Sequence, residues 1–84
     1  MAAKGRTLVF GKRLNNLIEE SKKSQREIAA ELGISQASLS FYILGKREPT
    51  LSVLVRISNY FNVSTDYLLG TQFWRRIVHE FFRM

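Results

Sequence analysis

The 84-residue sequence contains no cysteine, a single proline and a single histidine. Without cysteine, the chain can form neither disulfides nor thiolate metal sites, so the packing of its elements must hold the fold. The one histidine, His79, has no second metal ligand at a suitable spacing, and the sequence carries no Gly-rich phosphate loop or nucleophile motif. We therefore do not expect an enzyme, and we expect neither a cofactor nor a bound metal.

Long hydrophobic runs are also missing. No apolar run approaches the roughly 20 residues that a membrane-spanning helix needs, and the first residues lack the apolar region of a signal peptide. We therefore expect a cytoplasmic protein without a membrane partner. Apolar residues make up 45% of the chain and aromatic residues 12%, which is enough for the packed core of one small domain.

The stretch from Ser24 to Tyr42 has the pattern of two short helices joined by a tight turn. Ser24 is a good N-cap, and Glu27 three residues later completes a capping box. Gly33 accepts the left-handed conformation in which the first helix must end, and Ser35 then caps the second helix. The inner faces are filled by Ile28, Ala29, Leu32, Leu39 and Tyr42. This pattern is typical of a helix-turn-helix, whose second helix enters the DNA major groove.

Beyond that stretch, residues 10–70 resemble the phage repressor/Cro-like (XRE-type) helix-turn-helix DNA-binding family. The resemblance rests on an ordered series of motifs: FGKRL at 10–14, SQ at 24–25, LGISQ at 32–36, GKREP at 45–49 and FNVSTDYLLG at 61–70. Such a series is hard to obtain by chance. It implies an all-α fold in which residues 1–70 form a compact five-helix domain and double-stranded DNA is the partner.

The resemblance also implies which residues contact DNA. Gln25 would reach a phosphate and brace Gln36, which would read adenine through a bidentate amide contact. The outer side of the second helix would carry the other base readers, and basic residues at both ends of the motif would meet phosphates. The candidate DNA-binding set is Ser24, Gln25, Arg26, Ser35, Gln36, Ala37, Ser40, Phe41, Lys46 and Arg47.

Phe41 departs from the family, which usually places a polar or basic residue at this position. An exposed phenylalanine can contact thymine methyl groups, or it can belong to a protein-binding patch. Leu44 raises the same question. We favour the methyl contact, and the protein-binding alternative stays open.

The flanking segments predict three further helices. The first runs from about Leu8 to Ser21 and follows a loose arm over residues 1–6. The second is capped by Thr50, ends at Asn62 and has an inner face of Leu51, Leu54, Val55, Ile57 and Ser58. The third begins after Ser64 and closes at Gly70.

Residues 71–84 fall outside the family pattern and form an amphipathic segment. On a helical wheel, one side carries Phe73, Trp74, Ile77, Val78, Phe81 and Phe82. So much apolar surface is not left in water, so we predict a C-terminal dimerisation helix that pairs with a second chain. A tail folded back on its own core is the competing arrangement.

The sequence thus predicts a sequence-specific transcriptional regulator, a homodimeric repressor that occupies a near-palindromic operator with two recognition helices. Similar small regulators can activate, so the sign of regulation stays open. One alternative is an antitoxin or adaptor that binds a protein partner through its aromatic tail. Another is peripheral membrane attachment, because Arg75, Arg76 and Arg83 flank the apolar side of the tail.

Overall fold

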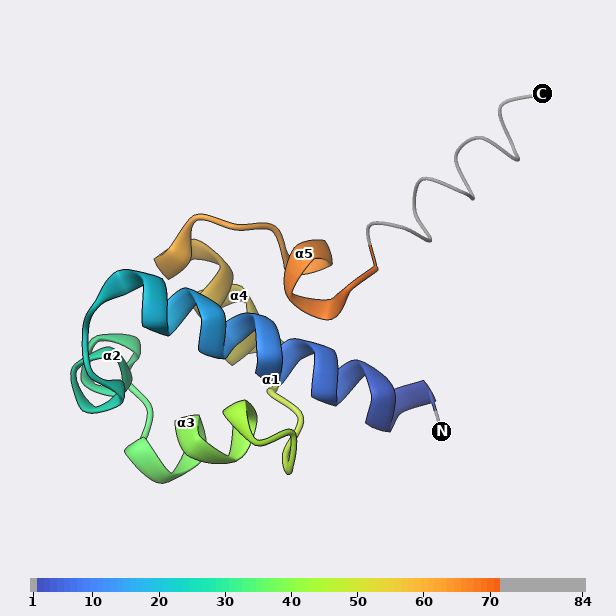
Figure 1. Ribbon diagram of the computed structural model, residues 1–84, viewed down its shortest axis with the longest axis horizontal. Helices are drawn as coiled ribbons and strands as arrows, with labels where there is room; N and C mark the ends of the chain where they lie inside the picture. The colour runs from blue at the N-terminus through green and yellow to red at the C-terminus, as the bar shows by residue number, and fades with distance from the viewer. Residues whose placement is uncertain (1, 72–84) are drawn as a thin grey trace.

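A computed structural model describes residues 2–71 of the chain as five helices (Figure 1). Their bounds are α1 Ala2–Ser21, α2 Gln25–Leu32, α3 Gln36–Ile43, α4 Leu51–Phe61 and α5 Thr65–Leu69. The long helix α1 packs against α3 on one side and α5 on the other, while α2 packs against α3 and α4 (Figure 1). The predicted all-α architecture is confirmed over this range. The predicted dimerisation helix lies outside the described residues.

The helix caps form as the sequence predicts. The Ser24 hydroxyl accepts a hydrogen bond from the Glu27 backbone N–H at 3.1 Å, and Glu27 Oε1 accepts one from the Ser24 N–H at 3.2 Å. Gly33 ends α2 with φ 74°, in the left-handed region. The hydroxyls of Ser35, Thr50 and Ser64 cap α3, α4 and α5 in the same way.

One apolar core joins all five helices. Its buried residues are Phe10, Leu14, Ile18, Ile28, Ala29, Leu32, Leu39, Tyr42, Leu54, Ile57 and Leu68. Phe10 meets Tyr42 edge to face, with ring centroids 6.2 Å apart. Helices as short as α2, α3 and α5 are not stable alone in water, so burial in this shared core is what stabilises them.

Helix α1 begins earlier than the sequence indicates. We expected a loose arm over residues 1–6, and this expectation is wrong for residues 2–6, because the helix starts at Ala2. Alanine has the highest helix propensity, and the early turns are anchored by Thr7, which is buried and donates a hydrogen bond to Glu48 Oε1 at 3.2 Å. Residues 2–6 have no apolar periodicity, so the spacing of apolar residues predicted a start of the helix that is too late.

The inner face of α4 is narrower than predicted. Leu54 and Ile57 are buried as expected, but Leu51 is 81% exposed and Val55 50% exposed. Val53, which the predicted stripe omitted, packs against the core instead. The main contacts of α4 are with α2 and α5. These two helices cover a smaller part of the α4 surface than its apolar residues suggest.

Helices α1 and α3 come closest at Gly11. A Cβ atom at this position would lie 2.6 Å from the carbonyl oxygens of both Tyr42 and Ile43, at the end of α3. Real Cβ atoms essentially never approach other atoms so closely. The distance between the two backbones therefore depends on glycine at this position.

A polar cluster of Lys23, Glu31 and Tyr60 joins α2 to α4 at the surface. Lys23 Nζ lies 3.1 Å from Glu31 Oε1, and the Tyr60 hydroxyl donates to the same carboxylate. The hydrogen bond from Tyr60 lowers the pKa of Glu31, while bonding to Glu31 raises the pKa values of Lys23 and Tyr60. Lys23 and Glu31 are exposed while Tyr60 is half-buried, so the ion pair contributes little stability, but the cluster directs the Lys23 ammonium towards α2 and α4.

We predict that Gly11→Ala destabilises the domain by about 1–3 kcal/mol, the usual range for overpacking, although alanine has the higher helix propensity. The reason is that the atoms nearest to the new Cβ belong to backbone carbonyls, which cannot rotate away as a side chain can. Thermal or urea unfolding monitored by circular dichroism measures the difference.

Gly5→Ala is the matched control, because it makes the same change in the same helix where a new Cβ would meet nothing within 4 Å. It should stabilise the protein by up to about 1 kcal/mol. A Gly11→Ala variant at least as stable as the Gly5→Ala variant would contradict the close approach of α1 and α3.

Candidate nucleic-acid interface

The two sides of α3 are set by its buried residues Leu39 and Tyr42. On the side away from the core, the helix and its C-cap carry Gln36, Ala37, Ser40, Phe41 and Leu44. All of these are exposed except Ser40, which is half-buried. Phe41 keeps 38% of its surface exposed and Leu44 55%. The predicted outward face of the second motif helix is therefore present.

The start of α2 carries the other predicted contacts. Gln25, the first residue of the helix, is half-buried, and Arg26 beside it is exposed. The Ser24 hydroxyl is engaged as the cap, as is that of Ser35 at the start of α3. The predicted contact between Gln25 and Gln36 stays a prediction.

The loop after α3 turns back towards the helix. Gly45, with φ 72°, adopts the left-handed conformation, and the Lys46 N–H donates to the Phe41 carbonyl at 2.9 Å. This hydrogen bond closes the end of α3 and reverses the chain. Lys46 and Arg47 are therefore held close to the last turns of α3.

The Arg47 side chain lies on the surface of α3. Its guanidinium carbon is 4.9 Å from the centre of the Phe41 ring, and Nη1 donates to Ser38 Oγ at 3.3 Å. Ser38 Oγ also accepts a hydrogen bond from the Ser35 hydroxyl at 2.9 Å. Sequence reasoning missed Ser38 as part of this surface, because no local pattern indicates a contact with a residue nine positions away across a turn.

The charges near α3 are unequal. Arg26, Lys46 and Arg47 are exposed, and so are the carboxylates of Glu27 and Glu48, so three cations stand beside two anions. Glu27 is held by the capping box, and Glu48 accepts the hydrogen bond from Thr7. Clustered exposed cations beside an outward helix face suit the phosphates that flank a major groove.

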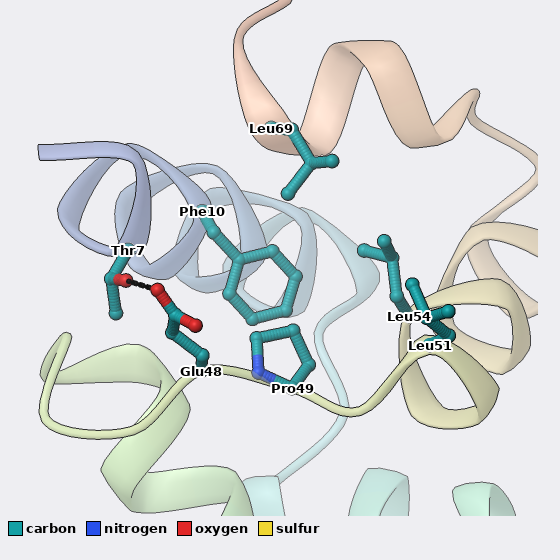
Figure 2. A pocket seen from close by; sticks show the side chains of 7 residues that line it. All are labelled: Thr7, Phe10, Glu48, Pro49, Leu51, Leu54 and Leu69. Carbon is teal, nitrogen blue, oxygen red and sulfur yellow. Dashed lines mark hydrogen bonds between the residues drawn. The ribbon is translucent and has the colours of Figure 1, made fainter. Parts of the chain in front are cut away.

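A pocket lies elsewhere on the described surface, and none of its lining residues comes from α2 or α3 (Figure 2). It has a volume of about 220 Å³ and is lined by Thr7, Phe10, Glu48, Pro49, Leu51, Leu54 and Leu69. Its polar side chains, Thr7 and Glu48, bond to each other in Figure 2, so the remaining lining is apolar. Leu69 places this pocket next to the end of α5.

Residues 2–71 show neither a metal site nor a membrane span. No group of three or more His, Asp or Glu residues in this part of the chain is placed to hold a metal ion. No helix within the same range is long and apolar enough to cross a membrane.

Proteins with similar sequences are known. The sequence profile described as helix-turn-helix matches residues 14–68. The chain is 43% identical over 61 residues to the HTH-type transcriptional regulator ImmR of Bacillus subtilis, covering 73% of this chain and 48% of that protein. It is 38% identical over 58 residues to the cryptic phage CTXphi transcriptional repressor RstR of Vibrio cholerae, covering 69% and 52%. The chain thus spans about half the length of these curated relatives.

A solved structure is also similar. The solution structure of the SOS-response transcriptional repressor LexA from Eubacterium rectale matches with a TM-score of 0.75 and 28% sequence identity. The match covers 77% of this chain and 69% of that one.

Proposed function

The chain belongs to the XRE-type helix-turn-helix family, and we propose that it is a cytoplasmic transcriptional regulator that binds double-stranded DNA sequence-specifically. The observation that carries the proposal is the outer face of α3, which presents amide, hydroxyl and aromatic groups beside an arginine while the opposite side is buried. A single α-helix with such a face fits the major groove and can read base edges there. Repression would follow because the regulator bound to its operator would block polymerase.

The roles within the interface follow from side-chain chemistry. Gln36 can read adenine through its amide, Ala37 can pack against a thymine methyl group, and Ser40 can donate or accept. Arg26 and Lys46 supply charge to phosphates. Phosphate contacts fix the position of the domain on DNA, whereas base contacts provide sequence preference.

A homodimer on a near-palindromic operator forms part of the proposal. Helix α3 has eight residues, about 12 Å at 1.5 Å per residue, so one copy reads only a short half-site. Two copies related by two-fold symmetry would place recognition helices in major grooves roughly 34 Å apart. We propose that residues 73–82, which lie outside the described residues, join the two copies beside α5.

The fold-back alternative is supported by the pocket in Figure 2. An apolar cavity of about 150 Å³ can hold benzene, so a pocket of about 220 Å³ has room for one aromatic ring. Leu69 lines it, and Phe73 follows only four residues later. In that arrangement the tail would pack against the domain of its own chain, and the protein would be monomeric.

A protein-binding function, as an antitoxin or adaptor, is a second candidate. The observation that favours it is the exposure of Leu51 and Val55 on α4, which lie one helical turn apart. Two exposed apolar side chains are ordinary in a soluble domain. DNA binding therefore remains the leading proposal.

We predict that Gln36→Ala weakens binding to the operator by about 1–3 kcal/mol and leaves non-specific binding nearly unchanged. The reason is that the amide contributes only where it meets its adenine. Fluorescence anisotropy with a duplex selected by the wild-type protein, compared with an unrelated duplex, measures both. Asn59→Ala removes an exposed amide from α4 and should change neither affinity. Equal affinity of Gln36→Ala and wild type for the selected duplex would refute the base-reading role.

We further predict that truncation after Gly70 yields a folded monomer with much weaker operator binding. The core described above ends at Leu68, so the domain keeps its packing, whereas the apolar residues proposed to join two copies are removed. Sedimentation velocity gives the oligomeric state and circular dichroism the fold. A truncated protein that stayed dimeric would contradict the role of the tail, and one that unfolded would favour the fold-back arrangement.

A further inference from the structure

The side chain of Arg47 lies on α3 and does not extend freely into solvent. Its backbone follows the turn beyond the end of α3, yet its guanidinium reaches back to Ser38, the third residue of that helix. The N-terminal part of a recognition helix is the part that contacts base edges. The positive charge of Arg47 therefore lies beside the N-terminal part of α3, where base contacts are expected.

We propose that Arg47 reads a guanine of the operator, held in position by Phe41 and Ser38. This inference rests on the proposed function and assigns one base of the site. A guanidinium has five N–H donors in a rigid fork, so donation from Nη1 to Ser38 Oγ leaves donors for O6 and N7 of guanine. The bidentate pairing of arginine with guanine is the commonest specific contact to DNA.

Phe41 orients the guanidinium. With the guanidinium carbon 4.9 Å from its ring centre, the aromatic face supports the planar group by a cation–π interaction. An arginine already ordered in the free protein loses less conformational freedom on binding. A phosphate contact, by contrast, needs only a nearby positive charge and no fixed plane.

The rest of the Phe41 ring remains available to DNA. The side chain is 38% exposed although Arg47 covers it, and it lies on the outward side of α3. Aromatic carbon can pack against the methyl group of thymine. Phe41 and Arg47 together therefore recognise a guanine with a thymine next to it.

The test begins with selection of bound sequences from a randomised duplex by the full-length protein. Dissociation constants are then measured for the selected duplex and for duplexes in which each base pair is replaced in turn. For wild type, replacing one G·C pair should weaken binding about 10-fold or more. For Arg47→Ala, this replacement should have almost no further effect, while the preferences at other positions remain.

Lys46→Ala is the matched control, because it removes the same charge from the neighbouring residue of the same loop. It should weaken all duplexes by a similar factor and leave every base preference intact. Phe41→Leu keeps both charges and should reduce the same guanine preference several-fold, because the guanidinium loses its aromatic support. Circular dichroism of each variant confirms that the domain remains folded.

Two results would overturn the proposal. Uniform weakening by Arg47→Ala, like that of Lys46→Ala, would make Arg47 a phosphate contact while leaving sequence-specific DNA binding in place. A wild-type protein that selects no sequence would instead refute the proposed function, and this inference with it.

Discussion

The close contact between Gly11 and the end of α3 positions the helices around it. It sets the distance between α1 and α3, and α1 is also the helix on which α5 rests. With this distance fixed, Leu39 and Tyr42 enter the core and the opposite side of α3 is turned outward. A helix of eight residues is not stable alone in water, so packing against the core determines where the outer face of α3 lies.

The polar groups around the motif divide into two kinds. Ser24, Glu27 and Ser35 satisfy the free N–H groups at helix starts, so their hydrogen bonds are used within the domain. Arg26 and Lys46 remain exposed, and Arg47 is ordered on the α3 surface. Glu27 and Glu48 keep their negative charges when they accept hydrogen bonds, so this side is positive only because Arg26, Lys46 and Arg47 outnumber them. This excess of cations is suited to phosphates.

Much of this fold could be predicted because its signals are local. Capping residues, left-handed glycines and the buried residues of α2 and α3 depend on neighbours within a few positions, and each is confirmed. Contacts between distant residues could not be predicted. The bond from Thr7 to Glu48 joins residues 41 positions apart, and the exposure of Leu51 and Val55 depends on how much of α4 its neighbours cover. The position of Arg47 against Ser38 likewise requires the turn at Gly45.

We propose that the outer face of α3, with the start of α2 and the loop after α3, forms the surface that binds DNA. This surface can be mapped by titrating ¹⁵N-labelled protein with a duplex that it selects and following the amide chemical shifts. We expect the largest changes in residues 24–27 and 35–47 and small changes along α4. Changes centred on Leu51, Leu54 and Leu69, around the pocket in Figure 2, with α3 unaffected, would contradict this proposal.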